Sequence, residues 1–417
     1  MRWVHPESGR RLKLAYCLNL HPADDLAGCL DGMRTVTLPL RERLGRPARF
    51  GVGVYLPAEL AAQLASEAGR SELARLAGFL EEHDLDPFTF NAFPFAGFGK
   101  AGLKQDVFRP TWAEAERLDF TRNVARVAAR LAGDAGHVSV STHPGFFGAP
   151  AAGPAERALD QMLGCVAELV RIEAETGRRI VLSIEAEPRA SAGDTRQLVG
   201  LLERLRARAL FVLPTAGVLD VTGALQRHLG SCLDACHAAV EFESASGCLE
   251  RSTHGGAPLG KIQFTNALAL REPAHNAEGR EALLALDEPA YLHQVTGRRG
   301  DEFERAHDLG EVRDDCADGS RWAACEEWRC HFHVPVDLAG LGGGLGTTRE
   351  WGDELLRTAL ARSDRWGTDE LHVEIETYTW DILPGAARGT GELVDGLERE
   401  YRHVLALLES EGWRAAD

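Results

Sequence analysis

The chain has 417 residues, of which 44% are hydrophobic and 26% are charged, a composition typical of a globular protein with a large core. Its formal net charge of −17 disfavours a nucleic acid or an anionic membrane surface as partner, because phosphate binding needs a concentrated basic face. No apolar run approaches the roughly 18 residues that a membrane span needs, and residues 1–20 are polar where the apolar part of a signal peptide would lie. We therefore expect no nucleic-acid partner, no membrane insertion and no signal peptide.

The nine cysteines are odd in number and scattered, and no two form a CxxC pair. This usage favours free thiols in the reduced cytoplasm over a disulfide framework. Cys232 and Cys236 flank Asp234, and Cys325 and Cys330 precede a pair of histidines. Packing explains these four cysteines better than thiolate ligation of a metal.

Short apolar runs alternate with amphipathic segments along the chain. Runs typical of buried strands lie at 12–20, 50–56, 87–93, 138–143, 180–187, 231–234, 261–265 and 371–377. Between them, apolar residues recur at spacings of three and four, which is the helical period. Eight strands, most of them followed by a helix, predict an α/β fold with a parallel sheet closed into a (β/α)₈ (TIM) barrel. An open doubly wound sheet is the competing architecture, but no GxGxxG follows the first strand.

A ninth apolar run at 331–336 does not fit the strand count. We interpret it as part of a long insertion, about 267–351, between strands seven and eight. Within it, YLHQVTGRRGDEFERAHDL predicts a hairpin that turns at 297–301, and the glycine-rich 340–346 predicts a flexible loop. Since no domain-scale linker is present, residues 1–417 are expected to form a single barrel domain.

Acidic and histidine side chains gather where the predicted strands end and in the insertion, and the C-terminal ends of barrel strands carry the functional groups of this fold. These residues are His143, Glu185, Glu187, Asp234, His237, His331, His333, Glu374 and Glu376. Taken singly, each is better explained as an ion-pair partner, a helix cap or a packing residue. Five separate strand ends or loops delivering such groups to one face favour a shared site.

Side chains alternate faces along a strand, so residues two apart project together. Glu185 therefore shares a face with Glu187, Glu374 with Glu376, and His331 with His333. Several carboxylates in a barrel lumen would repel one another unless a cation neutralised them. Mixed carboxylate and imidazole ligands suit Zn²⁺, Mn²⁺ or Fe²⁺, and the sequence does not choose among them.

These motifs resemble the xylose-isomerase-like barrel superfamily, which holds sugar and sugar-phosphate isomerases and epimerases and the apurinic-site endonucleases. The matching segments are His143-Pro144-Gly145, similar to HPG; Glu185, similar to the strand-five metal ligand; Asp234-Ala235-Cys236-His237, similar to DTCH; His331-Phe332-His333, similar to DRH; and Glu376-Thr377, similar to the final ET. Gln263 and Asn91 stand where relatives place metal-binding histidines, so the resemblance implies one or two ions rather than three.

Within the superfamily the chain most resembles the EboE-type metabolite traffic proteins. The likeness rests on LAYCLNLH, FNAFPF, QDVFRPTW, CLDACHAAVEFE, GKIQFTNAL, DEPAYLHQV, HFHVPV and HVEIETYTWDILP. It implies an isomerase/epimerase-like barrel associated with the export or handling of secondary-metabolite precursors, without an assigned reaction.

The resemblance implies a metal-dependent isomerase or epimerase-like enzyme acting on a small polyhydroxylated or carbonyl metabolite. Glu185 and Glu376 would be both metal ligands and catalytic acid/base groups. Asp234 and His333 would complete the coordination, and His237 would bind the metal or the substrate. His143 and His331 would hold a second ion.

The residues expected to contact the substrate are Gln263, Glu187, Asn91, Lys100, Lys104, Arg109, His293 and Trp380. The two lysines and Arg109 lie in or next to a glycine-rich loop after the third strand, where they would meet an anionic group. Two alternatives stay open, because a fold does not fix a function. One is metal-dependent hydrolysis of a small phosphoester, and the other is a non-enzymatic protein that binds and hands over a metabolite.

Overall fold

The computed structural model describes residues 1–97, 102–317, 319–383 and 389–416. Its centre is a closed barrel of eight parallel strands. In barrel order these are β2 (Arg11–Cys17), β3 (Phe50–Tyr55), β4 (Leu85–Asn91), β5 (Val138–Thr142), β6 (Ile180–Glu185), β7 (Leu229–Asp234), β8 (Leu259–Phe264) and β15 (Glu370–Ile375). β15 pairs with β2 from Glu370 opposite Arg11 to Ile375 opposite Tyr16, which closes the barrel. The predicted (β/α)₈ barrel is confirmed.

Nearly every residue of these strands is buried, because helices cover the outside of the barrel and side chains fill its interior. Inside, small residues leave room for polar ones. A Cβ on Gly53 of β3 would overlap the carboxylate of Glu374, which reaches across from β15. Glu374 in turn forms an ion pair with Lys261 of β8, and both side chains are fully buried. A pair of opposite charges thus occupies the lumen below the strand ends.

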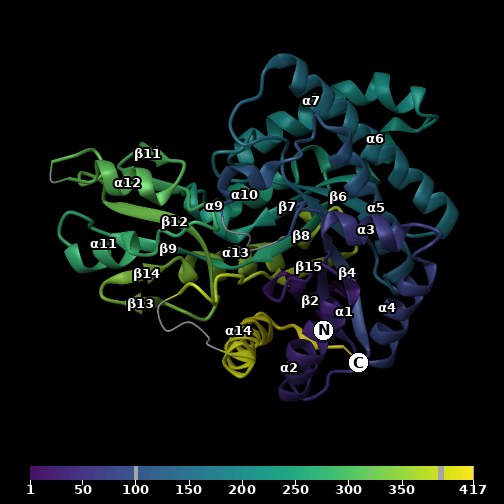
Figure 1. The fold of residues 1–417 in the computed structure, drawn as a ribbon, viewed down its shortest axis with the longest axis horizontal. Helices are drawn as coiled ribbons and strands as arrows, with labels where there is room; N and C mark the ends of the chain where they lie inside the picture. Colours follow the sequence, from purple (N-terminus) through teal and green to yellow (C-terminus); the bar gives the residue numbers. More distant parts are fainter. Residues whose placement is uncertain (98–101, 318, 384–388, 417) are drawn as a thin grey trace.

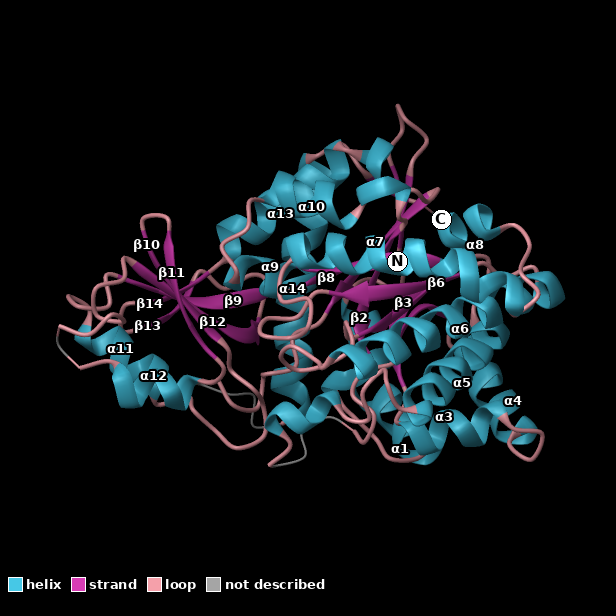
Figure 2. Ribbon diagram, turned by 90° about the horizontal axis from the view of Figure 1, so that it is seen from above, coloured by secondary structure: helices cyan, strands magenta, loops and turns pink. Residues whose placement is uncertain are grey.

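Helices form the outer layer of the barrel (Figures 1 and 2). They are α1 (Leu26–Gly32), α2 (Leu38–Arg43), α3 (Ala58–Ala65), α4 (Arg70–Glu82), α5 (Ala115–Leu131), α6 (Ala152–Thr176), α7 (Thr195–Thr215), α8 (Val221–His228), α9 (Ala235–Val240), α10 (Ala245–Ser252), α13 (Arg349–Ala361) and α14 (Thr390–Ser410). Most present an apolar stripe to the strands. The two chain ends meet where β1 (Arg2–Val4) pairs antiparallel with β16 (Arg414–Ala415).

The segment between β8 and β15 contains a second sheet with its own apolar core, which projects from the barrel as a separate lobe (Figures 1 and 2). Its strands are β9 (Asn266–Arg271), β10 (Val295–Arg299), β11 (Glu302–Ala306), β12 (Glu327–Val334), β13 (Gly340–Gly342) and β14 (Leu345–Thr347), in the order β11-β10-β12-β9-β14-β13. Helices α11 (Ala277–Leu284) and α12 (Leu309–Asp315) belong to the same lobe. The predicted insertion is confirmed.

Two local predictions in the insertion have different outcomes. The β10–β11 hairpin turns between Arg299 and Glu302, inside the predicted range. The prediction of a flexible loop at 340–346 is wrong, because these residues form the β13–β14 hairpin, which pairs with the edge of β9.

One arginine ties the inserted sheet to the barrel. Arg189, in the loop after β6, donates from Nε to the carbonyl of Ala306 at 3.1 Å and from Nη2 to the carbonyl of Val295 at 2.8 Å. Its Nη1 lies 2.6 Å from Oε1 of Glu241, the residue that follows α9. Because β12 pairs with β10 through Cys330 opposite Val295, Arg189 also fixes where β12 sits against the barrel.

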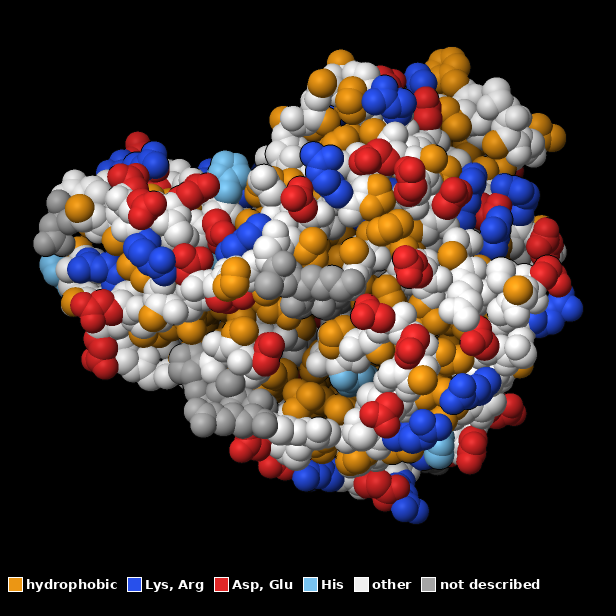
Figure 3. All heavy atoms as spheres, in the orientation of Figure 1, with side chains coloured by type: hydrophobic (Ala, Val, Ile, Leu, Met, Phe, Trp, Pro, Cys, Tyr) orange, Lys and Arg blue, Asp and Glu red, His pale blue; other side chains and the backbone are white. Residues whose placement is uncertain are grey.

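The nine cysteines all lie in the described residues, and none of them forms a disulfide. None of the helices in the described part of the chain combines the length and the apolar character needed to cross a bilayer. On the face drawn in Figure 3, acidic and basic side chains are interspersed among apolar ones.

Candidate metal centre

Three buried imidazoles converge at the mouth of the barrel. His237 lies in the first turn of α9, directly after β7, and His331 and His333 lie on β12 of the insertion. The Nε2 atom of His237 is 3.1 Å from Nε2 of His331 and 3.3 Å from Nε2 of His333, and the last two are 2.9 Å apart. The alternation of β12 turns His331 and His333 to one face, and the Asp234 carboxylate, which caps α9, accepts the backbone N–H of His237.

In two of the three rings, a backbone carbonyl sets which nitrogen carries the proton. Nδ1 of His237 lies 2.9 Å from the carbonyl of Ala186, and Nδ1 of His333 lies 3.2 Å from the carbonyl of Glu376. A carbonyl can only accept, so both Nδ1 atoms donate and both Nε2 atoms present lone pairs.

A glutamine does the same for His331. Gln294 donates from Nε2 to the carbonyl of Pro188 at 3.0 Å, which turns its Oε1 toward Nδ1 of His331. Three lone pairs therefore face one another without a proton between them. Burial lowers the pKa of all three imidazoles, which disfavours a proton as the bridge. The arrangement fits a divalent cation, whose histidine ligands are commonly held by hydrogen bonds at their other nitrogen.

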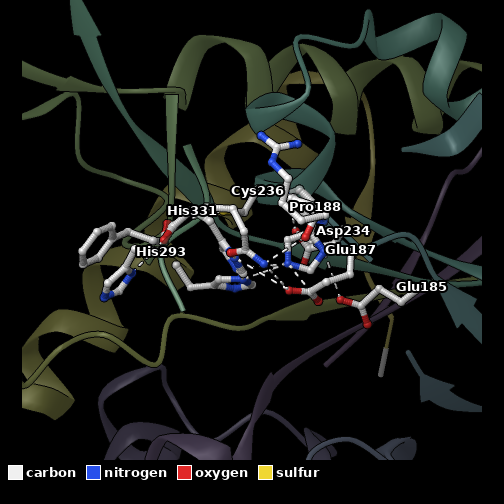
Figure 4. A network of polar contacts seen from close by, with 12 residues as sticks. Glu185, Glu187, Pro188, Asp234, Cys236, His293 and His331 are labelled. Atoms are coloured by element: carbon white, nitrogen blue, oxygen red, sulfur yellow. Dashed lines mark hydrogen bonds and ion pairs between the residues drawn. The ribbon is translucent and has the colours of Figure 1, made fainter. Parts of the chain in front are cut away.

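Further donors surround the imidazoles. Ligand atoms within 4.8 Å of one another are offered by Glu187 with His237 and His331, by Asp234 with His237 and His333, and by Cys236 with His331 and His333. In Figure 4 the side chains of His331 and Glu187 approach each other, and the Nδ1–Oε1 distance between them is 3.7 Å. A set of three histidines with one carboxylate or one open position is typical of zinc.

Beside the imidazoles, three carboxylates surround one amide group. Nε2 of Gln263, on β8, lies 3.3 Å from Oε1 of Glu185 and 3.3 Å from Oδ2 of Asp234, and it also contacts Oε2 of Glu376. The thiol of Cys232 donates to Oε1 of Gln263 at 2.9 Å, which turns the NH₂ group toward the acids.

The three acids hold protons more tightly than free carboxyl groups. Burial, with the neighbouring charge of Asp234, raises the pKa of Glu185 well above its ordinary value, and burial raises the pKa of Asp234 to about 7. Burial likewise raises the pKa of Glu376, whose Oε1 accepts from Asn19 and Asn91 at 3.0 and 3.2 Å. All three acids therefore keep a proton to higher pH than free carboxyl groups do.

The single ligand set expected from the sequence is thus divided in two. Glu185, Asp234 and Glu376 gather around Gln263, while His333 joins His237 and His331. The two groups touch, because Nδ1 of His333 is 3.7 Å from Oε2 of Glu376 and Nδ1 of His237 is 3.3 Å from Oε1 of Glu185.

His143 was expected to hold a second ion, and the structure places it elsewhere. Its ring packs against Phe93 and Phe108, with centroids at 5.0 and 5.3 Å, and its Nδ1 accepts the backbone N–H of Gly145 at 3.1 Å. It belongs to none of the ligand groups found among the described residues. The turn after β5, where Gly145 has a φ of +134°, directs this histidine into the aromatic loop.

The predicted substrate contacts also divide. Glu187, Gln263, Asn91 and Lys104 line the pocket above the imidazoles. Lys100 lies outside the described residues. The other three predicted contacts are absent from the pocket's described lining.

Arg109, His293 and Trp380 each have other contacts that keep them out of the described pocket lining. Arg109 is exposed and pairs with Asp106. His293 stacks on Phe332 at 3.7 Å and bonds to the carbonyl of His331 at 3.0 Å, so it supports β12 from behind. Trp380 packs against Gly396 of α14.

The pocket encloses about 680 Å³, counting the part of its mouth that is open to solvent. Its described lining also includes residues that the sequence did not single out, among them Tyr291, Leu292 and Tyr378. Tyr378 follows Glu376 by two positions, so its spacing in the final strand motif was a usable signal. Nothing local marks Gln294 as the residue that orients His331.

No protein-family model matches the chain, and no curated protein does. Among solved structures, an L-ribulose 3-epimerase is 11% identical with a TM-score of 0.47, covering 96% of this chain and 95% of its own. A D-allulose 3-epimerase from Methylomonas sp. in complex with D-allulose is 10% identical with a TM-score of 0.45, covering 95% and 97%. The IOLI protein with a binding zinc atom is 12% identical with a TM-score of 0.44, covering 96% and 99%. At these values the likeness carries no functional conclusion, and the barrel is established by the strand pairing itself.

Proposed function

We propose that this protein is a divalent-metal-dependent isomerase or epimerase-like enzyme that moves a proton beside a carbonyl of a small hydroxylated metabolite. The observation that carries the proposal is the contact between three converging imidazoles and a group of buried carboxyls whose pKa burial raises. An isomerase needs both, a group that stabilises charge on a substrate oxygen and groups that take and return a proton.

His237, His331 and His333 would hold the metal, with Glu187 beside them. A bound divalent ion draws electron density from a substrate oxygen, which acidifies the neighbouring C–H bond. The ion would be zinc, manganese or iron, and the three-histidine set favours zinc.

Glu185 and Glu376 are the proton-transfer groups in this proposal. They come from different strands, β6 and β15, and each has an oxygen in contact with the amide of Gln263. Two negative charges held close together and buried are unfavourable, so in this proposal one of the two acts as the protonated acid and the other as the ionised base. Such a pair removes a proton on one side of a carbon and returns it on the other.

The motif resemblance to isomerases and epimerases of the xylose-isomerase-like superfamily supports this proposal. The further resemblance to EboE-type proteins extends it to cytoplasmic handling of a secondary-metabolite precursor.

Heavy-water exchange tests the proposal. Zinc-loaded protein is incubated in D₂O with a panel of ketoses, aldoses and α-hydroxy ketones, and deuterium beside the carbonyl is measured by mass spectrometry. Glu185→Gln and Glu376→Gln should each abolish incorporation. Glu168→Gln is the matched control, since Glu168 is also buried but lies on α6 and pairs with Arg126. Absence of exchange across the panel would overturn the proposal.

Hydrolysis of a small phosphoester is the second candidate. The three-histidine set favours it, because catalytic zinc sites of this kind leave a position for water, whose pKa the metal lowers. Release of phosphate from simple phosphoesters, without deuterium incorporation, would favour hydrolysis. A pure carrier would show neither, and its Glu185→Gln variant would lose only ligand retention.

A further inference from the structure

The pocket has two chemically different parts. Most of its polar residues stand at or just beyond the ends of β4, β6, β7, β8, β12 and β15. Its apolar residues belong to the loop after β4 and to the insertion, which extend beyond the strand ends. They include Phe93, Leu103, Val107, Phe108, Ala290 and Leu292. A molecule with its oxygens at the metal centre would therefore contact apolar side chains with its other end.

Aromatic rings continue from the metal centre into this outer part. Tyr378 stacks on His333 with centroids 4.5 Å apart and planes 26° from parallel. Tyr291 lies against Tyr378 at 5.3 Å. From the β4 side, Phe93 and Phe108 contact each other at 5.3 Å. Ring faces and edges of this kind favour a planar aromatic partner over a flexible alkyl chain.

The outer part offers little to a charged group. Lys104 is the cation that lines it among the described residues, and its Nζ lies 2.7 Å from Asp308 and 3.7 Å from Asp287. A substrate anion would have to displace one of these carboxylates from the lysine. An uncharged group avoids that cost.

We propose that the substrate carries an uncharged aromatic group beyond its hydroxyl- and carbonyl-bearing head. The placement of the head rests on the proposed function, whereas the aromatic part rests on the pocket walls alone. The substrate class is then an aryl-substituted hydroxy ketone or hydroxy aldehyde rather than a free sugar.

Two probes with the same head test this. Hydroxyacetone and 2-hydroxy-1-phenylethanone differ only in a methyl or a phenyl group on the carbonyl. Their binding to the full-length protein is measured by calorimetry, with and without added zinc. The phenyl compound should bind at least about tenfold more tightly, since the ring buries more apolar surface and stacks.

Tyr291→Ser should reduce that preference, measured as the ratio of the two dissociation constants, severalfold. Phe303→Ser is the control, since Phe303 is 36% exposed on β11 and does not line the pocket. Equal affinity for the two probes, binding of neither, or an unchanged preference in Tyr291→Ser would overturn the inference. A phenyl preference in a protein that binds no zinc would keep the inference and refute the metal-dependent function instead.

Discussion

Replacing Arg189 by methionine should loosen the inserted sheet from the barrel. The side chain of Arg189 is 8% exposed and that of its partner Glu241 is 3% exposed. Removing one partner of a buried ion pair costs about 3–5 kcal/mol, because the remaining charge stays buried. Nε of Arg305 lies 3.4 Å from Oε2 of Glu241 and offsets part of that cost. We therefore expect a loss near the lower limit, about 3 kcal/mol.

Urea unfolding of Arg189→Met measures this loss, and Arg305→Met is the matched control. Arg305 shares Glu241 as partner, but its side chain is 44% exposed, so its removal should cost no more than about 1 kcal/mol. Equal losses in the two variants, or none in Arg189→Met, would refute the reasoning.

The same variant should weaken metal binding. His331 and His333 stand on β12, which Arg189 positions through β10, whereas His237 stands on the barrel side. Loss of a residue that orients metal ligands commonly costs 10–100-fold in affinity. The zinc dissociation constant of Arg189→Met should rise by about that factor, and that of Arg305→Met should not.

Two further substitutions probe buried charges. Burial raises the pKa of Glu400 to about 8 from its ordinary 4.5. The folded state thus binds this proton more tightly, and the associated stability, on the order of 3–5 kcal/mol, is complete below pH 4.5 and lost as pH rises through about 8. Glu400→Gln should flatten that decline in urea unfolding between pH 5 and 9, and a parallel decline would contradict the assignment. Lys261→Met should cost about 3–5 kcal/mol by leaving Glu374 unpaired in the lumen, with most of it restored in Lys261→Met/Glu374→Leu; no restoration would show that the pair is not the cause.

The barrel could be predicted because its strands are buried on both faces and read as short continuous apolar runs. The insertion could be located because the run at 331–336 exceeded the strand count. Its docking could not, since it depends on contacts between segments far apart in the sequence, such as those of Arg189 with the carbonyls of Val295 and Ala306. The hairpin at 340–346 was missed because a glycine-rich segment is typical of a loop. Its pairing with the edge of β9 depends on the tertiary structure, which the sequence does not show.

Alternation along a strand was enough to place His331 and His333 on one face. The position of Gln263 among the acids could not be predicted. The sequence shows a glutamine where relatives have a metal ligand, but it does not show which groups the amide contacts. For His143 the motif predicted a metal ligand, whereas the side chain packs against Phe93 and Phe108. The direction of a side chain beside a tight turn depends on its neighbours in space, which the motif does not give.

Zinc titration of two matched variants tests the central claim. Asparagine keeps a polar group where Nδ1 of histidine lies and removes Nε2, so His331→Asn deletes one converging nitrogen and His143→Asn deletes a nitrogen outside the cluster. The metal-free wild-type protein and His143→Asn should each bind about one equivalent of zinc, and His331→Asn should bind at least tenfold more weakly. Less than about half an equivalent in the wild type, or equal affinity in the two variants, would contradict a metal centre built from His237, His331 and His333.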